Sequence, residues 1–198
     1  HILEDYYPEF VRHRRRTANA IARLLNILFL QKRFKQFEHK YSGLEGFDFV
    51  SAALTFFDFS IRLPESQKAR IPATGRLVIA SNHPIGSLDG IALLDLVRQV
   101  RTDVRVVANG MLMQLQPLRS VLLPVNNMSG FTTRRDLLAI RKHLENDGAL
   151  IIFPAGEVSR LGLKGVRDGR WNNGFVKLAS ATKAPILPVF VAGYNSVF

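Results

Sequence analysis

Short apolar runs alternate with amphipathic helical segments through the last two thirds of the chain, and this alternation limits the possible folds. Each run has the length and composition of a buried strand. The runs are residues 77–80, 104–108, 121–125, 149–153 and 186–192. Helical periodicity fills intervals between them, for example in residues 173–182. The alternation predicts an α/β domain with a largely parallel central sheet flanked by helices.

Two of these runs end in polar clusters. Residues 77–80 lead into residues 81–90 (Ser-Asn-His-Pro-Ile-Gly-Ser-Leu-Asp-Gly). Residues 149–153 lead into residues 154–160 (Pro-Ala-Gly-Glu-Val-Ser-Arg). The carboxyl ends of parallel strands lie at the same edge of a sheet, where ligands bind in open α/β folds. We therefore expect both clusters to form one site.

His83 and Asp89 are the candidate catalytic pair. Pro84 favours an extended conformation at His83, at the end of the strand. Apolar residues at helical spacing place Asp89 in the first turn of the following helix. They are Leu93, Leu96, Val97 and Val100. The loop is short enough for the carboxylate to reach the imidazole, which predicts a general base and its orienting partner. The alternative is that Asp89 only caps the helix and His83 is a hydrogen-bonded strand-end residue.

Four blocks in this order resemble the glycerolipid acyltransferases, which include the 1-acylglycerol-3-phosphate acyltransferases. The blocks are Asn82-His83 with Asp89, residues 130–134 (Gly-Phe-Thr-Thr-Arg), residues 153–156 (Phe-Pro-Ala-Gly) and residues 186–189 (Ile-Leu-Pro-Val). The resemblance implies transfer of a fatty acyl chain from an acyl-carrier-protein or coenzyme A thioester to a lysolipid hydroxyl. The thioester is then a co-substrate, and no cofactor is bound.

The chain departs from this family pattern at three places. Five residues separate His83 from Asp89 where the family usually has four, and Ala155 and Val158 stand where it usually has Glu and Arg. The nearby Glu157 and Arg160 could replace those side chains. The pattern looks closer to the haemolysin-like branch, which is similar to enzymes that O-acylate lyso-ornithine lipids. The expected acceptor is therefore a lyso-ornithine-type aminolipid or lysophosphatidate.

The predicted substrate-binding residues come from these blocks. They are Asn82, Arg134, Arg135, Gly156, Glu157, Ser159 and Arg160. Arg134 and Arg135 begin a helix, a place that favours an anionic headgroup, or they are ordinary surface charges. Backbone N–H groups near Gly156 are candidates to bind the oxyanion. Glu157 and Arg160 contact the acceptor or pair with each other.

Composition excludes several kinds of chemistry. The chain has no cysteine, which rules out disulfides, thiolate zinc sites and a thiol nucleophile. It also lacks a Gly-x-Ser-x-Gly motif, and its five histidines do not have metal-ligand spacing, so direct transfer without a metal is expected. With 198 residues we expect one catalytic domain, at residues 67–198, in a chain that is C-terminally incomplete.

Residues 1–66 are expected to form basic amphipathic helices. The chain has a net charge of +11, and residues 1–40 contain nine Lys or Arg against four Asp or Glu. Ile21, Leu24, Leu25 and Leu28 follow helical spacing, but the apolar run is much shorter than the roughly 20 residues that span a bilayer. We expect this segment and the apolar stretch 47–63 to dock on an anionic membrane, at its cytoplasmic face. The alternative is a lid packed on the core.

Two other functions remain as alternatives. An RNA-binding module is compatible with a pI near 10.5 and with the Gly-x-x-Gly pattern of residues 162–165, although no nucleic acid partner is expected. A non-catalytic lipid-binding protein of the same fold is the other alternative. Residues 164–171 are expected to form an exposed basic loop, with Trp171 on the core or at a lipid interface.

Overall fold

The computed structural model describes residues 36, 37, 39–110, 112–125, 133–162 and 165–193. Contacts divide the chain into two compact units, His1–Ser42 and Gly43–Phe198, and the second contains the sheet. The predicted basic helix with Leu24, Leu25 and Leu28 lies outside the described residues. Its membrane role, and the expected functional division after residue 66, stay predictions.

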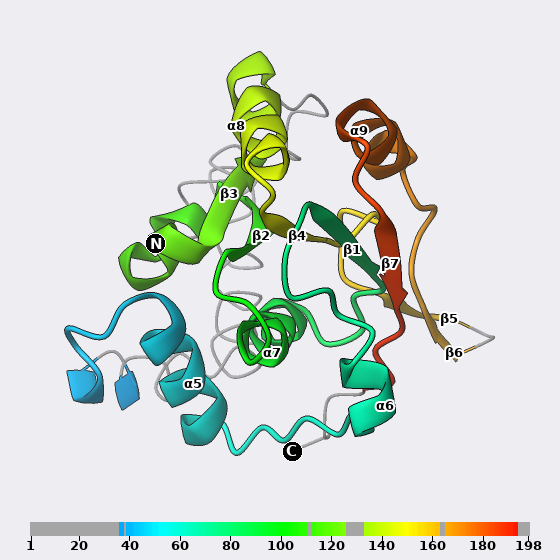
Figure 1. Cartoon of the computed structure of the whole chain (residues 1–198). Helices are drawn as coiled ribbons and strands as arrows, with labels where there is room; N and C mark the ends of the chain where they lie inside the picture. Colours follow the sequence, from blue (N-terminus) through cyan, green and yellow to red (C-terminus); the bar gives the residue numbers. More distant parts are fainter. Residues whose placement is uncertain (1–35, 38, 111, 126–132, 163–164, 194–198) are drawn as a thin grey trace, which may run out of the picture. The chain divides into compact units, whose positions relative to one another are not determined.

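Five strands form the central sheet (Figure 1). They are β1 (Leu77–Ser81), β2 (Val104–Asn109), β3 (Leu122–Val125), β4 (Ala149–Ile152) and β7 (Ile186–Val189). Their order is β3-β2-β4-β1-β7, and every neighbouring pair is parallel. In the register, Ile79 of β1 faces Ile151 on one side and Leu187 on the other. The predicted α/β fold with a largely parallel sheet is confirmed.

Helices cover both faces of this sheet, which is why its central strands are continuous apolar runs. All five residues of β1 are buried. Helix α7 (Ser87–Arg98) lies against one face, and α8 (Arg134–Glu145) and α9 (Gly174–Thr182) lie against the other (Figure 1). Between the sheet and α8, the fully buried Leu144 and Leu150 belong to one apolar cluster. Burying a side chain of this size contributes about 1.5–3 kcal/mol.

Part of the apolar stretch 47–63 is used inside the second unit. Helix α5 (Gly46–Phe56) packs on α7 and on the 3-10 helix η2 (Gln116–Val121). It buries Phe49, Val50, Ala53 and Leu54. This packing corresponds to the core alternative for that part of the stretch. The following residues Ile61 and Leu63 are exposed.

Helix α8 has a capping residue at its start and a left-handed residue just after its end. Thr133 is its N-cap, and the Thr133 Oγ1 accepts a hydrogen bond from the Asp136 N–H (3.1 Å). The chain leaves the helix through Asp147, which has a left-handed φ of 62°. Within the described residues, no helix combines the length and the apolar composition needed to cross a membrane.

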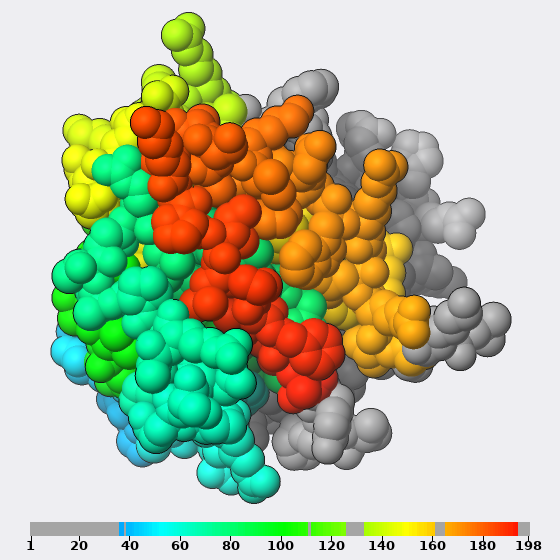
Figure 2. Space-filling view, turned by 45° about the vertical axis from the view of Figure 1, so that its right-hand side comes forward, coloured from blue at the N-terminus to red at the C-terminus, as the bar shows by residue number. Residues whose placement is uncertain are grey.

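One short strand lies in the expected basic loop, residues 164–171, and pairs with another short strand just before it. β5 (Arg160–Gly162) and β6 (Gly165–Arg167) form an antiparallel hairpin, and Gly162 pairs with Gly165 at its end. Strands of three residues are too short to give a periodic signal, so the sequence did not reveal them. The Gly-x-x-Gly pattern therefore belongs to a hairpin. Figure 2 shows this segment and the β7 segment on one face of the molecule.

Candidate active site

The structure brings the two predicted catalytic residues together. His83 lies two residues beyond β1, and Asp89 is the third residue of α7. The His83 Nδ1 is 3.1 Å from the Asp89 Oδ2. The Asp89 side chain is fully buried, whereas the His83 side chain is 17% exposed. A buried carboxylate next to a partly exposed imidazole is the arrangement expected of a base and its orienting partner.

Asp89 also caps its own helix, so the two interpretations of this residue hold together. Its Oδ2 accepts hydrogen bonds from the backbone N–H of Ile85 (2.8 Å) and of Gly86 (3.1 Å). In return, the Asp89 N–H donates to the Gly86 carbonyl (2.9 Å). Gly86 has φ 92° and ψ −138°, a conformation that glycine adopts without strain. The five-residue loop therefore returns the carboxylate to the imidazole through this glycine.

The second carboxylate oxygen of Asp89, Oδ1, has a different environment from Oδ2. Within the described residues, Asp89 Oδ1 is buried and has no hydrogen-bond partner. All three donors thus converge on Oδ2, from the imidazole and from two peptide groups. This convergence fixes Asp89 Oδ2 relative to the imidazole.

The surroundings of His83 leave one ring nitrogen for a substrate. An ionised carboxylate only accepts hydrogen bonds, so when Asp89 is ionised the contact requires Nδ1 to be the protonated nitrogen of His83. Nε2 then carries the lone pair, and no hydrogen bond joins it to the described part of the chain. The ring stacks on Phe153, with centroids 4.0 Å apart and an angle of 24°. This stacking holds the imidazole plane while Nε2 remains available to accept a proton.

Asp168 is a site residue that the sequence did not indicate. Its Oδ1 accepts hydrogen bonds from the His83 backbone N–H (3.1 Å) and from the Ser159 hydroxyl. Its Oδ2 accepts from the Trp171 Nε1 (2.8 Å). The Ser159 N–H in turn donates to the His83 carbonyl (2.9 Å). Both sides of the His83 residue are therefore held by the segment that follows β4. The only local signal was Asp168-Gly169, which is typical of a turn.

Asn82 joins β1 to the end of β7. Its Nδ2 donates to the Val191 carbonyl (2.9 Å), and its Oδ1 accepts from the Val191 N–H (2.6 Å). The expected strand 186–192 accordingly ends at Val189, because Val191 pairs with this side chain. The predicted substrate-binding residue Asn82 thus has both ends of its amide occupied by backbone.

The segment after β4 contains four of the predicted substrate-binding residues, and the last of them, Arg160, begins β5. Gly156 has φ 70°, and its N–H donates to the Phe153 carbonyl (3.0 Å). Glu157 and Arg160 form an ion pair with each other, which was the alternative to contact with the acceptor. Ser159 donates to Asp168. In this structure all four residues have partners within the protein.

Arg134 and Arg135 lie in the first turn of α8, and both are exposed. Strand β3, which precedes α8 in the chain, is parallel to β2, and the parallel pairing continues through β4 to β1. The amino end of α8 consequently lies at the edge of the sheet that carries His83. Among the described residues, no hydrogen bond or ion pair links either arginine to His83 or Asp89.

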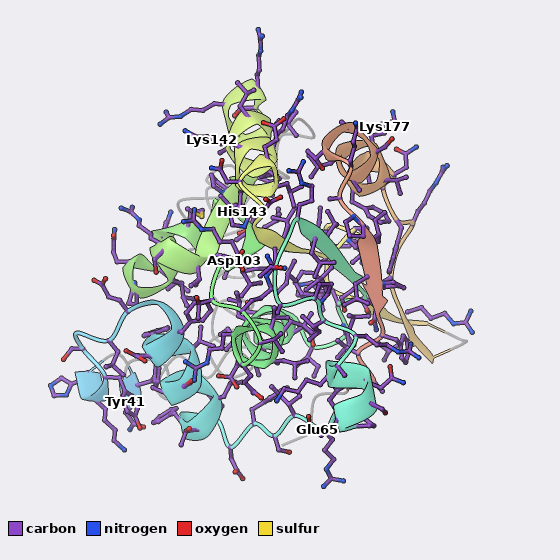
Figure 3. All side chains as sticks on the ribbon, viewed as in Figure 1. Tyr41, Glu65, Asp103, Lys142, His143 and Lys177 are labelled. Atoms are coloured by element: carbon purple, nitrogen blue, oxygen red, sulfur yellow. The ribbon has the colours of Figure 1, made fainter. Side chains whose placement is uncertain are left out.

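A pocket of about 280 Å³ lies at the opposite, amino edge of the sheet, away from the catalytic pair. Asp103 and His143, labelled in Figure 3, are among its lining residues. A hydrogen bond from Arg101 lowers the pKa of Asp103, and burial lowers the pKa of His143. His143 Nε2 bonds the Ala149 carbonyl (2.9 Å). The His143 contact connects α8 to β4. In the described part of the chain no group of three or more His, Asp or Glu could hold a metal ion.

Comparisons with known proteins agree with the blocks found in the sequence. A family model described as acyltransferase matches residues 7–198. The chain is similar to a lyso-glycine lipid O-acyltransferase of Phocaeicola vulgatus, with 30% identity over 154 residues, covering 77% of this chain and 54% of the relative. A protein of the same name from Bacteroides thetaiotaomicron is also 30% identical over 154 residues, with 77% and 56% covered. The chain spans about half the length of the curated relatives it matches. From the matched family model, the chain belongs to the acyltransferase family.

Proposed function

We propose that this protein is an O-acyltransferase that moves a fatty acyl chain from a thioester to the hydroxyl of a lysolipid. The observation that carries the proposal is the 3.1 Å contact between His83 Nδ1 and Asp89 Oδ2, which leaves Nε2 as a base. Membership of the acyltransferase family supports the reaction type. The names of both relatives support an oxygen acceptor on a lysolipid.

The proposed reaction is a direct transfer. His83 Nε2 takes the proton of the acceptor hydroxyl as its oxygen attacks the thioester carbonyl, and Asp89 stabilises the imidazolium that forms. The tetrahedral intermediate then collapses, the carbon–sulfur bond breaks, and the imidazolium returns the proton to the leaving thiolate. The products are an ester and a free thiol. Ser81 supports this route over a serine nucleophile, because it is buried and its hydroxyl donates to the Asn82 carbonyl (3.0 Å).

The acceptor is proposed to be an amino-acid-containing lysolipid of the kind that the relatives' names give. Lyso-ornithine lipid and lysophosphatidate, the acceptors expected from the sequence, should be tested beside this lysolipid. Arg134 and Arg135 are proposed to bind an anionic headgroup, since exposed guanidinium groups at a helix amino end attract anions. The oxyanion is proposed to bind N–H groups in the turn around Gly156, other than the Gly156 N–H that bonds Phe153.

The donor is proposed to be acyl carrier protein or coenzyme A. Both carriers are acidic, and the net charge of +11 suits either one. We also propose that the protein works as a peripheral protein at the cytoplasmic face of the cell membrane. The basic composition of residues 1–40 supports attraction to anionic lipid.

A matrix of donors and acceptors tests the proposal. Acyl-carrier-protein and coenzyme A thioesters are each combined with lyso-glycine lipid, lyso-ornithine lipid, lysophosphatidate or buffer, and thiol release and product mass are recorded. We expect acceptor-dependent thiol release together with the acylated lipid, and neither with the His83→Ala variant. Lipid binding without thiol release from any pair would instead favour a non-catalytic lipid-binding protein.

A further inference from the structure

A projecting hairpin beside the catalytic pair exposes apolar and cationic side chains together. We name it the hairpin rim and define it by Val158, Arg160, Val166, Arg167, Arg170 and Trp171. All six residues are exposed. Every residue of β6 is exposed, and Figure 1 shows β5 and β6 extending past β7. Trp171 is 40% exposed, so a large aromatic ring lies at the surface. The ring meets Phe175 edge-on, with 6.0 Å between the ring centroids.

The charges of the hairpin rim are not balanced within the protein. Arg160 and Arg167 are direct cross-strand partners, and like charges at such positions are unfavourable. Glu157 pairs with Arg160, and Asp168 is occupied by His83, Ser159 and Trp171. Among the described residues, Arg167 and Arg170 form no ion pair. This arrangement leaves positive charge for an anionic partner.

Hydrogen bonds tie the hairpin rim to the site. Asp168 accepts from the Trp171 indole and from the His83 backbone N–H. The Asn172 N–H donates to the Pro154 carbonyl (2.9 Å), which fixes the next residue to the turn after β4. In the segment after β7, Phe190 is 82% exposed, and its neighbour Val191 pairs with Asn82. Hydrogen bonds therefore connect the segments of both exposed aromatic residues, Trp171 and Phe190, to the end of β1. Figure 2 shows the β7 segment and the segment of the hairpin rim adjoining on the same face.

We propose that the hairpin rim docks on the surface of an anionic lipid bilayer and holds His83 next to it. The exposed ring of Trp171 is of the kind found at the level of lipid headgroups, while its N–H is bonded to Asp168, and arginines next to it attract anionic lipid. An acidic carrier protein would account for the arginines, but it would not require the exposed Val158, Val166 and Phe190. The proposal rests on the proposed function in one respect, because docking would bring the lysolipid hydroxyl to Nε2 directly from the membrane.

Trp171 makes the docking directly measurable. It is the single tryptophan of the chain, so its emission reports on the hairpin rim alone. The protein is titrated without acyl donor against vesicles of phosphatidylcholine with or without phosphatidylglycerol, and then against the same vesicles containing brominated lipid. We expect a blue shift and bromine quenching with anionic vesicles, and little of either with neutral ones. High salt should weaken both signals.

The arginines are tested by a double variant and a matched control. Arg167→Ser with Arg170→Ser should weaken binding to anionic vesicles by about tenfold or more, as expected for two basic residues near a charged surface. Arg105→Ser with Lys142→Ser removes the same charge from exposed residues on β2 and α8, and should weaken binding much less. Both double variants should keep wild-type activity on a water-soluble, short-chain acceptor, because neither changes the site.

Three results would overturn the proposal. In the first, the protein floats with anionic vesicles but Trp171 emission does not change, which would mean that another segment makes the contact. In the second, the two double variants lose binding equally. In the third, emission responds to acyl carrier protein and not to vesicles, which would assign the hairpin rim to the donor. Absence of acyl transfer together with a vesicle-dependent shift would reject the proposed function and leave docking supported.

Discussion

The carboxylate of Asp168 accepts a hydrogen bond from the backbone N–H of His83, a residue 85 positions earlier in the chain (3.1 Å). Both the ring and the backbone of His83 are thus held by hydrogen bonds. Asp89 binds its ring at Nδ1, and the segment after β4 binds its backbone through Asp168 and Ser159. In a base that must meet a hydroxyl at hydrogen-bond distance, an error of about 1 Å costs roughly 100-fold in rate. Backbone anchoring therefore has consequences for catalysis as well as for stability.

Removing either member of the His83 and Asp89 pair should abolish or greatly slow transfer. His83→Ala removes the base at a partly exposed position, so we expect loss of turnover with the fold intact by circular dichroism. Asp89→Asn should lower kcat by about 10⁴-fold, by analogy with the serine-protease triad, because the tautomer is no longer fixed. Steady-state thiol release measures both. More than a tenth of wild-type turnover in His83→Ala would rule out this mechanism.

Asp168 should act as a positioning residue. We expect Asp168→Ala to lower kcat by about 10- to 100-fold while the acceptor KM changes little, because the backbone of His83 loses its acceptor. Asp168→Asn keeps one carbonyl oxygen and should recover part of the loss. Ser159→Ala is the matched control, since it removes one donor to Asp168 and leaves the His83 contact. Equal losses in kcat for Ser159→Ala and Asp168→Ala would contradict this assignment, as would a change in KM alone.

Arg134 should bind the acceptor's anionic headgroup. Arg134→Ala is expected to raise the KM for an anionic acceptor by about tenfold, the loss of roughly one charge-assisted contact, and to leave the donor KM unchanged. Arg135→Ala removes the same charge from the next position in the same helical turn, and its effect on the acceptor KM measures how far the second guanidinium shares this role. Initial rates with an anionic and a neutral acceptor decide the point. If Arg134→Ala raises the KM equally for both acceptors, the guanidinium of Arg134 does not face the headgroup.

His143 should make the protein less stable in mild acid. Burial lowers its pKa in the folded protein, so the unfolded chain takes up a proton first as the pH falls through about 6.5. Stability is then lost as the pH falls below about 6.5, toward the lowered pKa of His143 in the folded protein. His143→Gln keeps a donor for the Ala149 carbonyl without the titration, and its urea midpoint should change less over this range. An unchanged pH dependence in His143→Gln would show that other groups dominate it.

The fold was largely predictable because its signals are local. Each central strand is an apolar run of a few residues, and each long helix of the second unit carries its periodicity within about twelve residues. The contact between His83 and Asp89 was predictable for the same reason, since the two residues lie six positions apart and one loop joins them. Asp89 was ambiguous in the sequence between cap and catalytic partner. In the structure one oxygen serves both roles.

The features that were not predicted depend on residues far apart in the chain. Asn82 pairs with Val191 across 109 positions, and Asp168 reaches His83 across 85. An Asn, or an Asp before Gly, looks the same in a sequence whether it serves a turn or a distant backbone group. Short-range periodicity and a short loop encode the α/β alternation and the pair of His83 and Asp89, so both could be predicted from the sequence. What holds His83 in place depends on long-range packing, because β4 and β7 lie on either side of β1 and bring Asp168 and Val191 to its end.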